Sequence, residues 1–424
     1  MSSASVEVAP RQTVRTGAEA ARLRRDLRRA GRRRQLAAIA LVLPLFLFLM
    51  FSFLVPIADM LRRSVVDPDL AAAWPNAAVV LRAWDRSSPP DEAMFAALGR
   101  DIRASAEART IAGPARRLNY ALSDGRSLVM NTGRALRKLQ GEPASWRDTL
   151  MSEDPAWGKQ KTWIALAHAA GPLTDFYLLT AVDLERDAAD RITSRPPDQS
   201  LYLTVLQRTA LMSVSVTLLC LLLGYPLAYY VANAPARSAN LLMILVLLPL
   251  WTSLLVRSAA WIVLLQDQGL VNDLLRASGL TDGPVRLIYN RIGVLIAMVH
   301  VQLPFMVLPI IASMKAVPPA YMRAAVSLGA HPAIAFFRVY MPQTFPGVAA
   351  GTLLVFIMSL GYYVTPALVG GANDQMLAYF IAYYTTSSAN WGLAAALGVL
   401  LLVATAILYA LYARLTNLGQ IRLG

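Results

Sequence analysis

Few side chains in this sequence have the type and spacing that catalysis needs. The three histidines, His168, His300 and His331, are too scattered along the chain to bind one metal ion. The single cysteine, Cys220, lies in an apolar run, so no disulfide can form within the chain. The phosphate-binding pattern G-x-x-x-x-G-K-[ST] is absent, and Lys315 has no glycine-rich loop before it. We therefore expect no catalytic residue, no metal site and no cofactor, and any ATP chemistry must come from a separate chain.

A second set of side chains lies in long apolar runs, where these side chains could bind a substrate rather than catalyse a reaction. Aromatic faces bind organic cations, and an ionisable residue within a membrane span is a functional candidate. The candidates for lining a translocation path are Tyr225, Tyr229, Trp251, Arg257, His300, Tyr362 and Tyr363. Each has a structural alternative, namely interfacial anchoring for the aromatic residues, snorkelling for Arg257 and an interior polar contact for His300.

The segment 314–345 combines prolines, a glycine and apolar residues at helical spacing. Pro318-Pro319 predicts a helix start, and Gly329 suits a left-handed C-terminal cap. Pro332 predicts a second helix, which Pro342 ends. The apolar faces are Tyr321, Ala325 and Leu328 in the first helix and Ile334, Phe337 and Met341 in the second. This helix–turn–helix is shaped to dock into a partner's groove; the alternative is a loop that packs only on its own chain.

The elements that position these residues are long apolar helices. Of the 424 residues, 56% are hydrophobic and 16% are charged. A spanning helix needs roughly 20 apolar residues. Six segments qualify: 36–58, 205–232, 240–265, 291–313, 346–370 and 392–413. The first is too long for the apolar core of a cleavable signal peptide. The sequence therefore predicts an all-α membrane protein with six transmembrane helices.

The charged residues favour one orientation of these helices. The net charge is +14, and residues 1–35 hold ten arginines against three acidic residues. With 1–35 in the cytoplasm, the inner segments are 233–239, 314–345 and the tail after residue 413. Those segments hold no acidic residue, and their basic residues are Arg237, Lys315, Arg323, Arg338, Arg414 and Arg422. The positive-inside rule thus predicts cytoplasmic N- and C-termini. Arginine beside an apolar run indicates membrane lipid as a partner, and no nucleic acid.

Residues 59–204 form the longest hydrophilic part of the chain. Residues 60–200 carry 19 basic and 18 acidic side chains, the balance of a solvated domain. Helical periodicity with Gly and Pro breaks predicts several short helices. The candidate core aromatic residues are Trp74, Trp84, Trp146, Trp157, Trp163 and Phe176. In the predicted orientation, 59–204 is a periplasmic domain inserted between the first two spans and long enough to fold independently.

Within 314–345, one pattern resembles a known motif. Arg323-Ala324-Ala325, three residues, Gly329, nine residues and Val339-x-Met341-Pro342 match the spacing of the EAA loop of ABC-importer permeases, which reads Glu-Ala-Ala, three residues, Gly, nine residues, Ile-x-Leu-Pro. Residues 201–418 are similar to spermidine/putrescine-type permeases of the PotB kind. The similar stretches are 224–230, Pro249-Leu250-Trp251, Val256-Arg257, 260–265, His300, 303–305, Val364-Thr365-Pro366 and Gly370-Gly371.

The resemblance implies a fold and a set of partners. Residues 205–418 would be the permease core of a type I ABC importer of the bacterial inner membrane, and 419–424 a cytoplasmic tail. The implied ATPase-coupling residues are Arg323, Ala324, Ala325, Gly329, Val339, Met341 and Pro342. The implied partners are two copies of an ABC ATPase subunit, a second permease subunit and a periplasmic solute-binding protein. The implied substrate is a small organic solute, polyamine-like or amino-acid-derived.

Two features depart from the family, and one alternative function stays open. Arg323 stands where the family has Glu, so its contact with the ATPase must differ in sign or be absent. The segment 59–204 is much longer than the family's usual loop.

The predicted spans contain no carboxylate, which a polyamine would ordinarily require and which proton or sodium coupling usually needs. The alternative is a non-transporting sensor or scaffold with 60–200 as its detector and 1–35 as its output.

Overall fold

The computed structural model describes residue 31, residues 36–187 and residues 189–420, with side chains up to residue 414. Apart from Gly31, the basic segment 1–35 lies outside the described residues, as does Arg422. The chain divides into two compact units, residues 1–60 and residues 61–424.

The first candidate span is the helix Leu36–Arg62, whose most apolar window has a mean hydropathy of 2.8. It contains a π-helical turn, η1 (Met50–Leu54), and ends with α2 (Val55–Arg62). The span predicted over 36–58 is therefore present and continues a few residues further.

Residues 63–201 fold into short helices and one small hairpin. The helices are α3 (Asp69–Ala73), α4 (Pro75–Ala83), α5 (Glu92–Glu107), α6 (Ala112–Ala121), α7 (Gly125–Leu136), α8 (Trp146–Glu153), η2 (Pro155–Gly158), α9 (Gln160–Ala169) and α10 (Phe176–Ala181). Strands β1 (Leu184–Arg186) and β2 (Ile192–Ser194) pair antiparallel, with Leu184 opposite Ser194. The helical prediction holds for most of this segment and missed the hairpin.

Tryptophans form much of the core of this segment. Trp74, Trp157 and Trp163 are fully buried, and Trp146 is nearly so. Each of the first three has a partner for its indole N–H: the Ser105 hydroxyl, the Thr132 hydroxyl and the Trp157 carbonyl oxygen respectively. Trp84 is half-buried against the same core. The prediction was wrong for Phe176, which packs in a separate cluster beside the permease helices, because α10 faces those helices.

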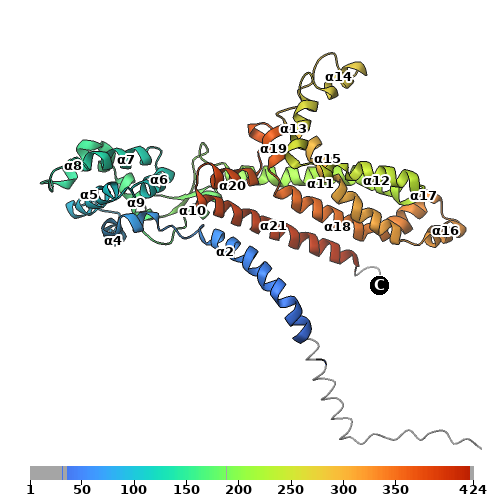
Figure 1. Cartoon of the computed structure of the whole chain (residues 1–424), viewed down its shortest axis with the longest axis horizontal. Coiled ribbons are helices and arrows are strands. Elements are labelled where there is room, and N and C mark those ends of the chain that lie inside the picture. Colours follow the sequence, from blue (N-terminus) through green and yellow to red (C-terminus); the bar gives the residue numbers. More distant parts are fainter. Residues whose placement is uncertain (1–30, 32–35, 188, 421–424) are drawn as a thin grey trace, which may run out of the picture. The chain divides into compact units, whose positions relative to one another are not determined.

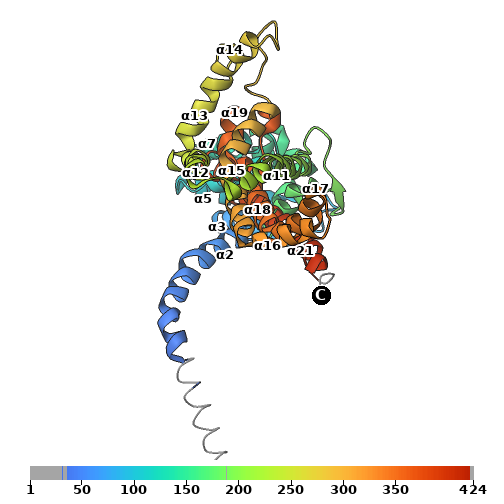
Figure 2. The same ribbon diagram turned by 90° about the vertical axis from the view of Figure 1, so that its right-hand side faces the viewer.

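The second half is a bundle of long helices with short ones at the breaks. These are α11 (Tyr202–Asn233), α12 (Ala236–Trp251), α13 (Leu254–Leu265), α14 (Leu270–Ala277), α15 (Arg291–Ala316), α16 (Pro319–Ser327), α17 (Pro332–Ala335), η3 (Phe336–Tyr340), α18 (Met341–Leu360), α19 (Val364–Val369), η4 (Ala372–Asp374), α20 (Leu377–Thr386) and α21 (Trp391–Gln420). Figures 1 and 2 show α11, α15 and α18 side by side, with α13 and α14 extending away from them. Within the described residues, six helices are long and apolar enough to cross a membrane.

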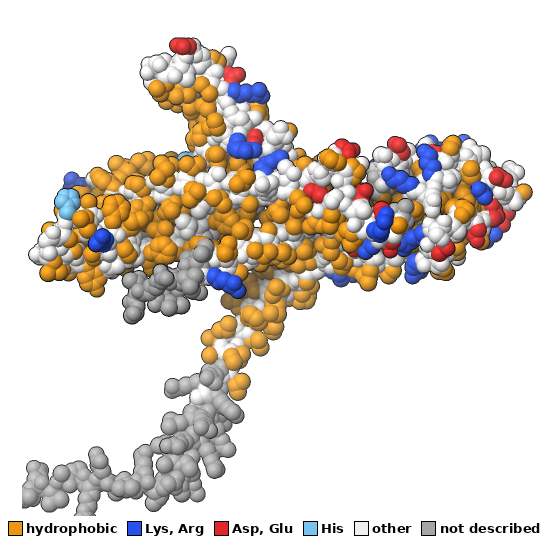
Figure 3. Space-filling view, turned by 180° about the vertical axis from the view of Figure 1, so that it is seen from behind, with side chains coloured by type: hydrophobic (Ala, Val, Ile, Leu, Met, Phe, Trp, Pro, Cys, Tyr) orange, Lys and Arg blue, Asp and Glu red, His pale blue; other side chains and the backbone are white. Residues whose placement is uncertain are grey.

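Small residues let α15 and α18 approach closely. A Cβ on Gly347 would lie 2.4 Å from Ser313 Cβ, and a Cβ on Gly351 would lie 2.9 Å from the Met306 carbonyl oxygen. Two glycines four residues apart are typical of tightly packed membrane helices. Charged side chains concentrate over the segment before α11, whereas the face of the bundle in Figure 3 is mostly hydrophobic.

Two predicted spans have the wrong boundaries. The span predicted over 240–265 is two helices, because α12 ends at Trp251 and the Ser253 hydroxyl caps α13 by accepting from Val256 N at 3.2 Å. The span predicted over 346–370 begins earlier, since one helical run extends over Pro332–Leu360. It also ends earlier, at Leu360, before the separate helix α19.

Pro342 does not end a helix, contrary to the prediction. It lies in the first turn of α18, directly after the π-helical turn η3. A proline inside a helical run removes one backbone hydrogen bond, and the wider π turn directly before it gives its ring room. The second helix of the 314–345 segment is therefore continuous with a membrane span.

The segment before α11 joins the bundle through α10 and through Asp183. The Asp183 carboxylate accepts from the backbone N–H groups of Leu201 and Tyr202, both at 3.0 Å, and Leu203, at 2.8 Å. Three orphan donors at the start of α11 are thereby satisfied by one side chain. Tyr177 of α10 packs on Gly392 in the first turn of α21, where an added Cβ would lie 2.4 Å from its ring.

Candidate coupling element and translocation path

Residues 314–345 form a short helical element, here called the coupling element, between α15 and α18. Helix α16 starts with Pro319 at its first position and is followed by Gly329 at φ +88°. Ala330 N donates to the Ala325 carbonyl oxygen at 3.1 Å, and Gly329 N donates to that of Val326 at 2.9 Å. This bond pair is the Schellman cap, which needs a left-handed residue at its centre. The predicted helix start and glycine cap are confirmed.

The next helix begins with a side-chain cap. His331 Nδ1 accepts from Ala333 N at 3.3 Å, and Pro332 is the first residue of α17. On the side that faces the bundle, Met322 and Phe336 pack against its core, and Tyr340 is buried there. These contacts do not involve its exposed side chains.

The outer surface of the coupling element is apolar with a basic rim. Its exposed large side chains are Tyr321 (50%), Leu328 (88%), Ile334 (51%), Phe337 (63%) and Met341 (42%). Arg323, Ala324 and Arg338 are also exposed, Ala325 and Val339 are half-buried, and Pro342 is exposed. A leucine that is nearly nine-tenths exposed on a rigid turn is unusual unless a partner covers it. Apolar side chains with a basic rim are the kind of surface that helices use to dock into a partner's groove.

The path candidates separate into two groups. Tyr225 and Tyr229 lie near the coupling element: the Tyr225 hydroxyl is 3.0 Å from that of Thr344, and the Tyr229 ring meets Phe336 edge-on at 5.2 Å. Tyr229 also meets Tyr340, at 5.7 Å. This group links the end of α11 to the turn that precedes α18.

The second group lies at the helix breaks. The Arg257 guanidinium donates to the Thr252 carbonyl oxygen at 2.7 Å and also to that of Pro249. These are carbonyls left free where α12 ends, and a cation is favoured at a helix C-terminus. Arg257 thus has a structural role, bonding the carbonyls at the end of α12, which is neither of the two roles considered from the sequence. Trp251, directly before the break, is 69% exposed.

The remaining members of that group lie on α15 and at the α18–α19 break. His300 Nδ1 accepts from Trp261 Nε1 at 3.2 Å. The Tyr362 hydroxyl accepts from Thr365 Oγ1 at 3.4 Å, and Thr365 Oγ1 is 3.0 Å from Ser258 Oγ on α13. Tyr363 is 42% exposed. The break residues of α18–α19 and the start of α13 are therefore tied together by hydroxyl groups.

The path candidates do not include Gln302, a polar residue inside the bundle. Gln302 is fully buried, and its Oε1 accepts from Ser359 Oγ at 2.8 Å. Among the described residues its Nε2 has no hydrogen-bond partner. An amide in the middle of an apolar run, two residues after His300, was the available signal. A buried polar group without a partner costs free energy, so it is a candidate for a role in function.

The comparisons with known proteins agree with this geometry. A model of the family "binding-protein-dependent transport system inner membrane component" matches residues 224–417. The spermidine/putrescine transport system permease protein PotB of Escherichia coli is 33% identical over 218 residues, which are 51% of this chain and 79% of that protein. PotB of Haemophilus influenzae is 35% identical over 218 residues, 51% of this chain and 76% of that protein. A solved bacterial ABC transporter involved in the import of alginate aligns with a TM-score of 0.43 and 17% identity, over 51% of this chain and 79% of that chain.

The fold and these matches define an inner-membrane permease subunit of an ABC importer. The chain belongs to the family of binding-protein-dependent transport system inner membrane components and is PotB-like within it. It is a multi-pass membrane transport subunit rather than an enzyme, and ATP hydrolysis belongs to a separate subunit. The sensor or scaffold alternative finds no support. The family model leaves residues 59–204 unmatched.

Proposed function

We propose that this permease imports a small organic solute, polyamine-like or amino-acid-derived, which a periplasmic binding protein delivers. Two copies of an ATPase subunit and a second permease subunit complete the transporter. The single observation that carries the mechanism is the exposed apolar surface of the coupling element on a rigidly capped turn. The similarity to PotB supports the substrate class.

In this mechanism the coupling element transmits the movement of the ATPase to the spans. Leu328 and Phe337 enter the ATPase cleft, and Arg323 meets an acidic group there. Because α17 and η3 continue directly into α18, a push on the element moves that helix as one body. Rigid elements of this kind are what couple distant sites. The aromatic and polar side chains at the two helix breaks then line the path that opens.

The proposed orientation places the N- and C-termini and the coupling element in the cytoplasm. Helix α11 supports it, since Tyr202 contacts Tyr384 beside the inserted segment and Tyr229 contacts Phe336 of the coupling element. Between these two residues the helix rises roughly 40 Å, at about 1.5 Å per residue. That is the thickness of a bilayer with its headgroups. The segment 59–204 and the coupling element therefore belong on opposite sides of the membrane.

Accessibility labelling tests this orientation. Cys220 is buried, so a cysteine placed at the exposed position 331 reports alone. His331→Cys in intact cells is expected to resist a membrane-impermeant maleimide and to react after the cells are opened. Reaction in intact cells would rule out the coupling mechanism.

A matched pair of glycine variants tests the contact with the ATPase. Gly329 (φ +88°) and Gly279 (φ +73°) both adopt left-handed backbone with open space around the Cβ position. Valine strains the backbone similarly at each, but only Gly329 lies in the coupling element. Gly329→Val is expected to lose the co-purifying ATPase subunit, whereas Gly279→Val keeps it. Equal retention by both variants would contradict the proposal. Arg323→Glu is expected to weaken the same complex, and better transport by it would refute the acidic partner group.

We also propose that the segment 59–204 is a docking surface for the binding protein or a cap on the pore. Its excision can be designed from the structure. Asp67 N donates to the Pro172 carbonyl oxygen at 3.1 Å, and Thr174 N donates to that of Val65 at 2.8 Å. A short glycine linker can therefore replace residues 69–170 while α10 and Asp183 stay in place. Loss of binding-protein affinity or of transport is expected, and retention of both would dispose of the idea.

A further inference from the structure

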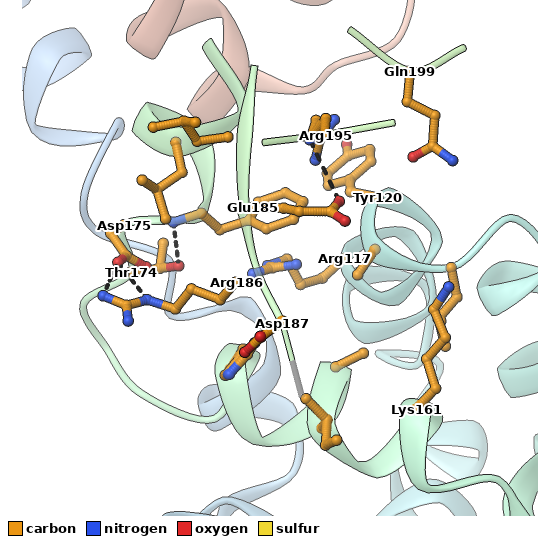
Figure 4. Close-up of a pocket in the computed structure, with 18 of the residues that line it drawn as sticks. Arg117, Tyr120, Lys161, Thr174, Asp175, Glu185, Arg186, Asp187, Arg195 and Gln199 are labelled. Atoms are coloured by element: carbon orange, nitrogen blue, oxygen red, sulfur yellow. Dashed lines mark hydrogen bonds and ion pairs between the residues drawn. The ribbon is translucent and has the colours of Figure 1, made fainter. Parts of the chain in front are cut away.

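The segment before α11 contains a cavity of its own. It has a volume of about 510 Å³ and is lined by α6, α9, α10, β1 and the chain after β2. Cavities of this size bind small organic molecules. Figure 4 shows Arg117, Tyr120, Glu185 and Arg195 around it, with Lys161 at one side. All of its lining residues belong to one compact unit and lie outside the residues that match the permease family.

The central feature of the cavity is a buried arginine that lacks acceptors. The side chain of Arg117 is 2% exposed, and its Nε donates to Asp67. Its guanidinium lies 4.4 Å from the centroid of the Phe176 ring. Among the described residues, neither terminal nitrogen, NH1 nor NH2, has a hydrogen-bond partner. Burying such donors without an acceptor is unfavourable, so the site suits a ligand that supplies one.

Other donors in the same cavity are also unsatisfied. The Tyr120 hydroxyl is buried without a partner in the described part of the chain. Burial raises the pKa of Tyr120, so its hydroxyl remains a donor at neutral pH. Arg195 Nε lies 3.8 Å from Glu185 Oε2, beyond hydrogen-bond distance. Lys161 adds an exposed ammonium group.

Two of the three acidic residues that line the cavity have close partners of their own. Asp175 pairs with Arg186 at 2.6 Å, and Asp187 pairs with Arg191 at 2.8 Å. The third, Glu185, lies 3.8 Å from Arg195, and Arg117 and Lys161 add further positive charge to the lining. The donor groups without acceptors therefore favour a ligand whose acceptor atoms carry negative charge, which argues against a cation. Apolar side chains of Leu122, Ile164 and Leu179 complete the walls. A ligand must match both a paired-donor arginine and an apolar wall, which inorganic phosphate does not.

We propose that this cavity binds a small organic carboxylate, with the carboxylate on Arg117 and Tyr120 and an apolar body against Ile164 and Leu179. The site is separate from the translocation path. It is also connected to the last span: the Asp67 carboxylate that holds Arg117 accepts from the Tyr177 hydroxyl at 3.0 Å, and Tyr177 packs on Gly392. Two hydrogen bonds, both to Asp67, and one packing contact thus link Arg117 to α21.

Titration calorimetry of the full chain in lipid nanodiscs tests the proposal. The probes are phenylacetate and hexanoate, each with its uncharged amide and its amine analogue, and inorganic phosphate. At least one carboxylate is expected to bind saturably, at least tenfold more tightly than its amide and its amine. No saturable binding by either carboxylate, tighter binding of an amine, or equal binding of phosphate would each overturn the proposal.

Matched variants locate the binding. Tyr120→Phe keeps the ring and removes only the unpartnered hydroxyl, and Arg117→Lys keeps a charge for Asp67 and removes the paired donors. Each is expected to weaken carboxylate binding about tenfold or more, the equivalent of about 1.4 kcal/mol. Lys161→Gln is expected to weaken it less, and Lys159→Gln, two residues away and outside the cavity, not at all. Unfolding temperatures of Tyr120→Phe and Lys159→Gln should match the parent. Unchanged affinity in both Tyr120→Phe and Arg117→Lys would place the ligand elsewhere and refute the assignment.

Discussion

The Arg257 guanidinium reaches back across the α12–α13 break and donates a hydrogen bond to the Thr252 carbonyl oxygen, 2.7 Å away. The same group also bonds the Pro249 carbonyl oxygen, so it holds the end of one helix from the first turn of the next. Helix ends inside a membrane need such partners, because no water is there to supply them. Arg257 therefore bridges the end of α12 and the first turn of α13.

Replacing Arg257 tests whether it is structural or contacts substrate. Arg257→Met keeps the length and removes the donors, so it should lower stability by about 1.5–3 kcal/mol, the range for hydrogen bonds to charged groups. Arg257→Lys should fall between Met and the parent, since an ammonium can donate to the two carbonyls that one guanidinium nitrogen now serves but loses the Nε bond to Thr252 Oγ1 at 3.2 Å. Thermal unfolding in detergent measures this. An unfolding temperature unchanged in Arg257→Met, with transport lost, would instead assign Arg257 to substrate.

Asp183 is expected to control the start of α11. Asp183→Ala leaves three backbone N–H groups without the acceptor that now serves them, and it puts alanine at φ +54°. We expect a loss of about 2–3 kcal/mol, with Asp183→Asn losing less because asparagine tolerates left-handed backbone. Asp91, which caps α5 through one bond to Met94 N at 2.8 Å, is the control, and Asp91→Ala should cost about 1 kcal/mol. Equal losses of unfolding free energy in Asp183→Ala and Asp91→Ala would show that the cap on α11 contributes no more than an ordinary helix cap.

The contact between α15 and α18 is expected to reject even one methyl group. In Gly347→Ala the new Cβ would lie 2.6 Å from the Pro309 carbonyl oxygen, which cannot move without bending α15. Overpacking of this kind costs about 1–3 kcal/mol. Gly398 in α21 is the matched control, because nothing lies within 4 Å of its Cβ position, and alanine there should be neutral or slightly stabilising. Thermal unfolding of both variants decides it, and a stable Gly347→Ala would show that the helices can separate freely.

His168 is expected to make stability fall in mild acid. Burial, with the nearby Arg86 charge, lowers the pKa of His168 below its usual value. The unfolded chain therefore takes up this proton first, so stability is full above about pH 6.5 and declines as the pH falls below it. The unfolding temperature of the parent should drop more between pH 7 and pH 5 than that of His168→Gln. Parallel pH profiles for the two proteins would show that His168 does not contribute.

The sequence determined the properties that depend on neighbouring residues. The number and approximate location of the spans follow from apolar length, and the cap at Gly329 follows from a local backbone requirement. The motif spacing from Arg323 to Pro342 is likewise local, and it led to the family that the comparisons show. Even so, a purely local rule was wrong at Pro342, because the π turn before it makes that position the beginning of α18.

The tertiary structure decided every pairing between distant residues. Arg117 meets Asp67 from 50 positions away, and Asp183 serves donors 18 to 20 positions further on. No periodicity in the chain predicts which carboxylate reaches which donor, because such pairs form only once the helices have packed and displaced water. For the same reason the assignment of Arg257 to a helix end and the unmet donors of Arg117 became visible only in the folded chain. Composition specifies which side chains prefer to be buried, and packing alone specifies which of them are buried together.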